Sequence, residues 1–305
     1  MAANDATQKT GLLGLDAYSP AEIQDKVEKL GVKKVRLPFV ASFMLSVVAG
    51  GSIGLGGMFF VIILADPTLG FAFQRLLGGI VFSLGLALVV IGGAELFTGN
   101  CLIVMAWANR QISTREVLGN WTTVWLGNLV GALGLVAMIF LAHHTDMNNG
   151  LVGAAVLKLA LSKIAPDMVT IFFKGVLCNI LVCLGVWLAY AGRSVADKMA
   201  GLILPVAAFV AAGFEHCVAN MYFLPLAWLL AATGHVPADL DVSAITLTGI
   251  LHNLIPATLG NIVGGAGCVG FVYWAIYRRA LGGLTPLDTA APAAADGDPA
   301  RRRAS

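Results

Sequence analysis

Six long apolar runs divide this chain of 305 residues. Each is longer than the roughly 18 residues that indicate a helix crossing a bilayer. Charged residues make up 12% of the chain and hydrophobic residues 58%, whereas charged residues reach about 25% in soluble domains. We therefore expect an all-α membrane protein with six transmembrane helices. The runs lie at about 38 to 64, 76 to 107, 117 to 142, 168 to 191, 199 to 232 and 244 to 277.

Basic residues are divided unequally between the two sides that six spans define. Fifteen of the 19 Lys and Arg fall on the side of both termini. Because basic loops stay in the cytoplasm, this bias predicts a multi-pass protein of the cell (inner) membrane with cytoplasmic N- and C-termini. The net charge of +2 gives no reason to expect a nucleic-acid partner. The basic residues on the opposite side are Arg75, Lys158, Lys163 and Lys174.

The segment before the first run carries a helix-start signal. Ser19 and Glu22 form a capping box, and the apolar residues Ile23, Val27 and Leu30 share one face of the helix that it predicts. Two placements are open for this amphipathic helix: on the lipids of the cytoplasmic membrane surface, or against the helix bundle. The expected organisation is a cytoplasmic N-terminal segment at 1–37, a six-span domain at 38–278 and a disordered cytoplasmic tail at 279–305.

The third and sixth runs resemble each other. The sequences "GNWTTVWLGNLVGALG" at 119–134 and "HNLIPATLGNIVGGAG" at 252–267 share a pattern of Asn, Leu, Gly and Val at a constant shift of 133 residues. The second and fifth runs share a fainter pattern, in "ELFTGN" at 95–100 and "EHCVAN" at 215–220. Two halves of three spans each must enter the membrane in opposite orientations. The pattern therefore predicts two inverted three-helix repeats.

The second and fifth runs are much longer than the roughly 20 residues that a span needs. Each contains a polar insertion with glycines, "GGAELFTGN" at 92–100 and "AAGFEHCVAN" at 211–220. We expect each run to form two half-helices joined by an irregular stretch near the membrane centre. Thr98 or Asn100 is the expected cap of one following half-helix, and Asn220 of the other. The N-termini of half-helices carry positive partial charge and favour a small anion there.

His216, in the insertion of the fifth run, is the candidate functional group, because an ionisable side chain inside a span is costly. The alternative is a neutral histidine that is hydrogen-bonded within the bundle. Glu95 and Glu215 occupy equivalent places in the two halves, and we expect their carboxylates to accept hydrogen bonds from unwound backbone N–H groups. The sequence has no metal-binding cysteine spacing and no cofactor fingerprint, so neither a metal nor a cofactor is expected.

Five stretches resemble signature sequences of the formate/nitrite transporters, a family of bacterial and archaeal membrane proteins that pass small monovalent anions. The likeness runs in the same order from about residue 19 to 278. It implies an aquaporin-like protomer of six helices with its own pore, broken second and fifth helices, and a homopentameric assembly. The stretches are "FSLGL" at 82–86, "AELFTGN" at 94–100, "KGVLCN" at 174–179, "GFEHCVANM" at 213–221 and "NLIPATLGN" at 253–261.

The same resemblance implies roles for individual residues. His216 matches the central pore histidine of the family, and Thr98 matches the loop threonine that hydrogen-bonds to it. Lys163 and Asn179 match polar residues beside the conduction path on its outer side, where a lysine raises the local concentration of anions. Support for the broken helices is expected from Glu95, Asn100, Glu215 and Asn220. The apolar constrictions on either side of the histidine correspond to Phe82, Leu86, Phe97 and Phe209.

The resemblance also implies the substrate class, a small monovalent anion. Formate is the first choice, because "FSLGL" and "NLIPATLGN" look closer to the formate branch of the family. Nitrite, acetate and lactate are alternatives, and both a channel and a proton-coupled transporter fit the sequence. Two other classes are less favoured. A water channel is expected to show Asn-Pro-Ala boxes, and an enzyme a nucleophile or metal constellation, and the sequence shows neither.

Overall fold

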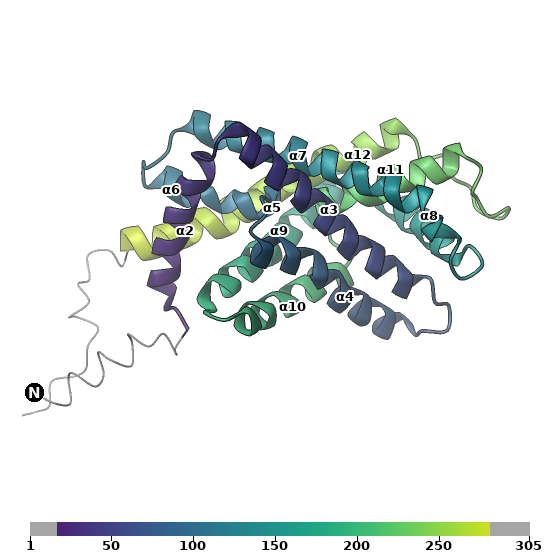
Figure 1. Cartoon of the computed structure of the whole chain (residues 1–305), viewed down its shortest axis with the longest axis horizontal. Coiled ribbons are helices and arrows are strands. Elements are labelled where there is room, and N and C mark those ends of the chain that lie inside the picture. The colour runs from purple at the N-terminus through teal and green to yellow at the C-terminus, as the bar shows by residue number, and fades with distance from the viewer. Residues whose placement is uncertain (1–16, 281–305) are drawn as a thin grey trace, which may run out of the picture.

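The computed structural model describes residues 17–280, and this part of the chain forms an elongated bundle of helices without a strand (Figure 1). Five helices are long and apolar enough to cross a bilayer, and they match five of the predicted runs. The tail at 281–305 lies outside the described residues. The five helices are α3 (Phe39–Leu64), α4 (Phe71–Gly92), α7 (Thr114–Leu141), α9 (Met168–Ala191) and a long C-terminal helix (Leu247–Arg279), which begins as α12 (Leu247–Ile262) and continues through η3 (Val263–Phe271) and α13 (Val272–Trp274).

The second run is interrupted at its polar insertion. Helix α4 ends at Gly92, and Gly93 adopts a φ of 81°, a left-handed conformation that stops the helix. Residues 94–96 form no regular structure. The chain then continues through α5 (Phe97–Asn100), a 3-10 turn (Cys101–Ile103) and α6 (Val104–Ala108). The predicted half-helix after this interruption is therefore the continuous segment Phe97–Ala108, which contains a 3-10 turn.

The fifth run is divided into two half-helices, α10 (Val195–Ala211) and α11 (Cys217–Ala232). They contain 17 and 16 residues, and each is too short to cross a bilayer at about 1.5 Å per residue. Gly213, with a φ of 70°, lies between them. Helix α10 begins before the predicted boundary because Ser194 and Asp197 form a capping box. The first turn of the helix is polar, so a boundary drawn from hydropathy leaves it out.

Helix α2 (Pro20–Val35) packs against the bundle. Its capping box forms as predicted, and hydrogen bonds from the backbone and side chain of Ser19 lower the pKa of the Glu22 carboxyl. Ile23 is 3% exposed and belongs to an apolar cluster with Trp187 of α9. Of the two placements that the sequence leaves open, the structure therefore favours packing on the bundle.

A buried carboxylate also fixes α2. Glu28 is 1% exposed and accepts hydrogen bonds from Asn109 at 2.9 Å and Gln111 at 3.3 Å, both beyond α6. Arg278, near the C-terminal end of the long helix, donates to Glu28 at 3.0 Å and also pairs with Asp25. A buried carboxylate is tolerated when charged and amide donors satisfy it. These contacts tie α2 to two other parts of the chain.

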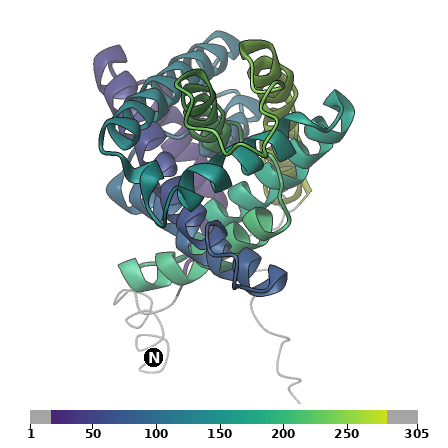
Figure 2. The same ribbon diagram turned by 90° about the vertical axis from the view of Figure 1, so that its right-hand side faces the viewer.

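The helices define two ends of the molecule. In Figure 1, α2 and α6 lie at one end of the long axis, α8 (Leu151–Ile164) lies at the opposite end, and α5 lies between them. We call these the α2 end and the α8 end. Figure 2 turns the α8 end toward the viewer and shows the bundle nearly end-on. Residues that belong to opposite ends therefore approach the centre from opposite directions.

Glycines allow two pairs of long helices to approach closely. A Cβ atom at Gly131 of α7 would overlap the backbone carbonyl of Val47 in α3. A Cβ atom at Gly264 of the long C-terminal helix would overlap the carbonyl of Val176 in α9 in the same way. Lipid tails are as apolar as the side chains, so close packing of small residues is a main source of helix association in a membrane.

The first prediction concerns the contact of α3 with α7. We expect Gly131→Ala to lower the Tm of the detergent-solubilised protein by on the order of 5 °C, because overpacking costs about 1–3 kcal/mol. Gly134→Ala, on the same helix, is the control, since nothing lies within 4 Å of a Cβ at that position. Thermal melts followed by size-exclusion chromatography give both values. Equal melting of the two variants would contradict the close contact.

Candidate functional site

Asn128 of α7 forms hydrogen bonds with backbone groups at the interruption after α4. Its Oδ1 accepts a hydrogen bond at 2.9 Å from the backbone N–H of Phe97, the first residue of α5. Its Nδ2 donates to the carbonyl oxygen of Ser46 in α3 at 2.7 Å and to that of Glu95 at 2.9 Å. One fully buried side chain thus binds two backbone groups at the interruption and one carbonyl of α3. An unpaired backbone group buried away from water would be costly.

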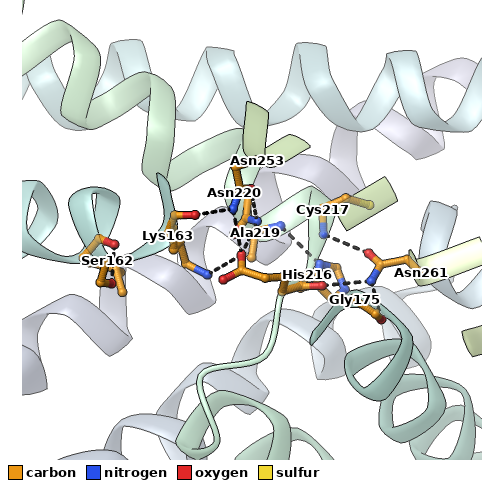
Figure 3. A network of polar contacts seen from close by, with 11 residues as sticks. Ser162, Lys163, Gly175, His216, Cys217, Ala219, Asn220, Asn253 and Asn261 are labelled. Carbon is orange, nitrogen blue, oxygen red and sulfur yellow. Dashed lines mark hydrogen bonds and ion pairs between the residues drawn. The ribbon is translucent and has the colours of Figure 1, made fainter. Parts of the chain in front are cut away.

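Asn261 of α12 makes the same set of bonds at the other interruption (Figure 3). Its Oδ1 accepts from the backbone N–H of Cys217, the first residue of α11, at 2.9 Å. Its Nδ2 donates to the carbonyl oxygens of Gly175 in α9 and of Glu215, each at 2.8 Å. Asn128 and Asn261 are the pair that recurs at a shift of 133 residues in the sequence. Their repetition therefore has a structural cause.

The half-helix caps differ from the three predicted ones, Thr98, Asn100 and Asn220. The residue before α5 is Leu96, which makes no side-chain cap. The residue before α11 is His216, whose Nδ1 accepts a hydrogen bond from the N–H of Ala219 at 3.1 Å. The prediction was wrong because Leu96 and His216 occupy the cap positions. Asparagines on neighbouring helices bind the first N–H group of each following half-helix.

Glu215 is the centre of a buried polar cluster toward the α8 end. It is 1% exposed, and its Oε2 accepts from Lys163 Nζ at 3.0 Å, Asn220 Nδ2 at 2.7 Å and Asn253 Nδ2 at 3.2 Å. Figure 3 shows Lys163, Asn220 and Asn253 close together, and they come from three separate elements. The Asn220 amide also donates to Asn253 Oδ1 at 2.7 Å. The cluster therefore links α8, α11 and α12.

Glu95 is the centre of a corresponding cluster toward the α2 end. It is 4% exposed, and it accepts from Lys34 Nζ at 2.8 Å and from Asn100 Nδ2 at 2.7 Å. Asn100 Nδ2 also approaches Asn120 Oδ1 of α7 at 3.0 Å. Lys34 belongs to α2, so the N-terminal helix supplies the cation at this end, as α8 does at the other.

These clusters correct the predicted partners of the two carboxylates. The carboxylates of Glu95 and Glu215 accept from ammonium and amide side chains instead of unwound backbone N–H groups. The asparagines described above already engage the first N–H group after each interruption, and a charged donor neutralises a buried carboxylate better. Lys163, expected beside the conduction path on the outer side, has a side chain that is 10% exposed and forms an ion pair with Glu215.

His216 and Thr98 meet between the two clusters. His216 Nε2 lies 3.0 Å from Thr98 Oγ1, and the two residues are 2% and 0% exposed. The imidazole also stacks on the ring of Phe209, with the ring centroids 5.8 Å apart and the planes at 22°. Each of the two polar residues comes from one of the interruptions. The hydrogen bond therefore joins the interrupted segments at the centre of the bundle.

The partners of His216 define where its proton lies when the ring is neutral. A backbone N–H only donates, so Nδ1, which accepts from Ala219, carries no proton. Nε2 then carries the proton and donates to the Thr98 hydroxyl oxygen. This arrangement leaves the hydroxyl proton of Thr98 available to another acceptor.

Two cavities approach this contact from opposite sides. The larger, of about 320 Å³, opens toward the α2 end and has Lys34, Leu86 and Glu95 on its wall. The smaller, of about 30 Å³, lies toward the α8 end and has His216 and Arg75 on its wall. The two cavities share no lining residue, so side chains separate them. Within residues 17–280, no cluster of His, Cys, Asp or Glu is suited to a metal ion.

Several aromatic rings line the smaller cavity. The rings of Phe82 and Phe209 meet edge to face with their centroids 5.9 Å apart, and each residue is at most 3% exposed. Phe60 contacts Phe82 in the same manner at 6.4 Å. Leu86, one helical turn from Phe82, instead faces the larger cavity. Three of the four apolar residues predicted at constrictions therefore lie on the walls of the two cavities, namely Phe82, Leu86 and Phe209.

Two predicted site residues lie elsewhere. Phe97 is on neither cavity wall, and its ring packs on Trp121 of α7 with the centroids 6.4 Å apart. Asn179 of α9 is fully buried, and its Nδ2 donates to the carbonyl oxygens of Thr98 at 3.2 Å and Asn261 at 2.6 Å. Asn179 thus links the first interruption to α12, close to the Thr98–His216 contact.

Sequence reasoning missed several residues of the site, among them Lys34, Arg75 and the asparagines Asn128 and Asn261. Lys34 had been assigned only to the side of the termini, and Arg75 only to the opposite side. A lysine or arginine outside an apolar run carries no signal of a distant partner. Asn128 and Asn261 did carry a signal, since they recur in both halves of the chain. An asparagine repeated at equivalent positions inside two spans indicates a buried amide with a structural partner.

Comparison with known proteins gives the class of this chain. Residues 21–275 match the family model described as formate/nitrite transporter. The chain therefore belongs to the formate/nitrite transporter family. With five helices suited to crossing a bilayer, it is an integral membrane protein of a transporter family, as the resemblance predicts.

Individual relatives agree with this assignment. The formate channel FocA of Escherichia coli (strain K12) is 39% identical over 274 residues, which cover 87% of this chain and 96% of that protein. FocA of Haemophilus influenzae is 41% identical over 268 residues, 83% of this chain and 93% of that protein. Among solved structures, a pentameric formate channel with formate bound is similar at a TM-score of 0.70 and 37% identity, with 78% of this chain and 97% of that chain covered. An ion channel of the same family gives a TM-score of 0.74 at 30% identity, with 84% and 98% covered.

The second prediction concerns the Lys163–Glu215 pair. We expect Lys163→Met to destabilise the protein by about 3–5 kcal/mol, because it leaves a buried carboxylate without its cation. The double variant Lys163→Met with Glu215→Gln should recover at least half of this loss, since no buried charge remains. Denaturation in detergent micelles measures the three stabilities. Lys158→Met removes an exposed lysine of the same helix and serves as the control. A double variant no more stable than Lys163→Met would contradict the pairing.

Proposed function

We propose that this chain forms a membrane channel or transporter for small monovalent anions, with formate as its main substrate. The observation that carries the proposal is the hydrogen bond between Thr98 and His216, which lies between two cavities that approach from opposite ends. Membership of the formate/nitrite transporter family supports an anion substrate. Relatives that are named formate channels favour formate over nitrite, acetate or lactate.

We propose that the fold consists of six spans in two inverted three-helix repeats, with the two interrupted helices as the second and fifth. Recurring contacts support this. The asparagines Asn128 and Asn261 make equivalent bonds. The N–H of Glu95 donates to the Leu45 carbonyl at 3.2 Å, and that of Glu215 donates to the Lys174 carbonyl at 3.3 Å. Equivalent bonds at both interruptions are expected when two halves share one fold.

The path would run from the larger cavity past Leu86 to the Thr98–His216 contact and on past Phe82 and Phe209. Apolar side chains exclude hydrated cations, because they offer no oxygen ligands to replace the lost water. An anion also loses water there, and it needs a donor to compensate. The hydroxyl proton of Thr98 supplies one, and the N-terminus of α11 adds positive partial charge. The path would therefore pass small anions that accept hydrogen bonds.

His216 would support this donor and make transport sensitive to pH. In its neutral form the imidazole donates to Thr98 and so polarises the hydroxyl that faces the anion. An anion at the centre also favours protonation of the ring, because opposite charges attract strongly in a dry environment. A proton can then accompany the anion across the apolar section. We therefore propose proton coupling through His216.

We further propose a homopentamer in the cell (inner) membrane, with both termini in the cytoplasm. The pentameric formate channel among the similar structures supports the assembly. The excess of basic residues beside the termini supports the orientation. In this orientation the α2 end is the inner end and the α8 end is the outer one.

The third prediction tests the Thr98 donor. We expect Thr98→Val to lower formate flux into proteoliposomes by about 10-fold or more, because a hydrogen bond to a charged group contributes about 1.5–3 kcal/mol. Thr122→Val replaces an exposed threonine of α7 and serves as the control. Wild-type protein without formate flux above that of empty vesicles would contradict the proposed function. A Thr98→Val variant with wild-type flux would contradict only the role of this hydroxyl.

The fourth prediction tests His216. Wild-type flux should change with pH as the histidine titrates, whereas His216→Asn keeps a polar side chain that does not titrate in this range. We expect the variant to show a flattened pH profile for formate uptake between about pH 5 and 8. Parallel uptake of nitrite, acetate and lactate ranks the substrates. An unaltered pH profile in the variant would refute proton coupling through this residue.

A further inference from the structure

We infer that the guanidinium of Arg75 is the outer capture site for the anion, whereas the family resemblance implies that Lys163 attracts anions there. The inference rests on the proposed function and deepens it. Arg75 lies in the second turn of α4 and shares the wall of the smaller cavity with His216. The guanidinium of Arg75 and the central histidine therefore border the same cavity.

The surroundings of Arg75 hold the guanidinium at this cavity. Its Cζ lies 5.5 Å from the centroid of the Phe71 ring, at a distance suited to a cation–π contact. A Cβ at Gly213 would lie 3.8 Å from Arg75 Nη1, so the guanidinium also borders the turn between α10 and α11. That turn leads directly to Glu215 and His216. Arg75 is thus positioned beside the segment that carries the central histidine.

Charge pairing distinguishes Arg75 from Lys163. Both residues line the smaller cavity, but the Lys163 ammonium lies 3.0 Å from the buried Glu215 carboxylate. Arg75 forms no ion pair with any Asp or Glu in the part of the chain that the structure describes. The pair of Lys163 and Glu215 has no net charge, whereas Arg75 contributes a full positive charge. An anion that approaches this cavity is therefore attracted mainly by Arg75.

The chemistry of the guanidinium fits the proposed substrate class. A guanidinium presents parallel N–H donors that bind the two oxygens of a carboxylate in a bidentate manner. Formate has two such oxygens, whereas a halide has a single spherical surface and gains less from this geometry. Arg75 is only half-buried, so water still reaches it and limits how strongly it holds an anion. Weak capture suits a pathway from which the anion must leave again.

Uptake from each side of the membrane tests the inference. Initial rates of labelled formate uptake are measured in spheroplasts, where the outer end faces the medium, and in inverted vesicles, where the inner end does. We expect Arg75→Gln to raise the KM from the outer side about 3- to 10-fold, and to change the KM from the inner side less than 2-fold. The maximal rate should stay within about 2-fold of wild type, since the central contact is intact.

Two further variants complete the experiment. Lys158→Gln removes an exposed basic residue of α8 and should leave both KM values unchanged. Arg75→Lys keeps the charge without the planar fork, and its outer KM should lie between those of wild type and Arg75→Gln. Should Arg75→Gln fail to fold, the test uses Arg75→Lys together with the rise of the wild-type outer KM in a non-permeant salt, which screens a capture charge.

The outcomes separate this inference from the proposed function. Wild-type formate uptake with an unchanged outer KM in Arg75→Gln would overturn the capture site alone. An equal rise of KM in Lys158→Gln would also overturn it, because general surface charge would then explain the effect. Absence of wild-type formate uptake would refute the proposed function itself. A rise confined to Arg75→Gln and to the outer side supports the capture site.

Discussion

The structure depends on how two helices can be interrupted within a bundle that is suited to a membrane. Each interruption frees backbone groups, and hydrocarbon offers them no partner. Asn128 and Asn261 address this problem, because each lies on a neighbouring helix and binds one N–H and one carbonyl at an interruption. Each also donates to a carbonyl of a further helix, α3 or α9. With these groups satisfied, the chain can bring Thr98 and His216 together at the centre. The proposed function is possible only because these two amides hold the interruptions in place.

The buried charges near the centre are also satisfied by partners from other parts of the chain. The carboxylates of Glu95 and Glu215 each have a lysine within 3.0 Å, so the two clusters carry no net charge. An unpaired lysine at that depth would hold an anion tightly in a medium of low dielectric and prevent its release. Neutral clusters avoid such a trap and leave selection to hydrogen bonding and size. The full positive charge of Arg75 instead lies where water still reaches it, and there attraction is weaker and more readily reversed.

The sequence predicted the broad architecture because hydropathy and glycine act locally. The runs, the two interruptions and the capping box of Ser19 all depend on residues close together in the chain. The partners of Glu95 and Glu215 did not follow from the sequence, since Lys34 lies 61 positions from Glu95 and Lys163 lies 52 positions from Glu215. Caps supplied by Asn128 and Asn261 come from other helices for the same reason. Their recurrence marked them as important without showing which backbone groups they bind.

The two interruptions differ in rigidity, and this difference bears on how the path opens. His216 precedes α11, a regular helix of 16 residues, whereas Thr98 lies in α5, which has four residues and runs into a 3-10 turn. The 3-10 geometry makes poorer hydrogen bonds than an α-helix. The Thr98 carbonyl is held by Asn179 at 3.2 Å and by Cys183 Sγ at 3.4 Å, the latter a weak thiol donor. Because side chains separate the two cavities, the proposed conduction would require movement near their boundary. The Thr98 segment has the weaker support, so we expect it to move while His216 stays in place.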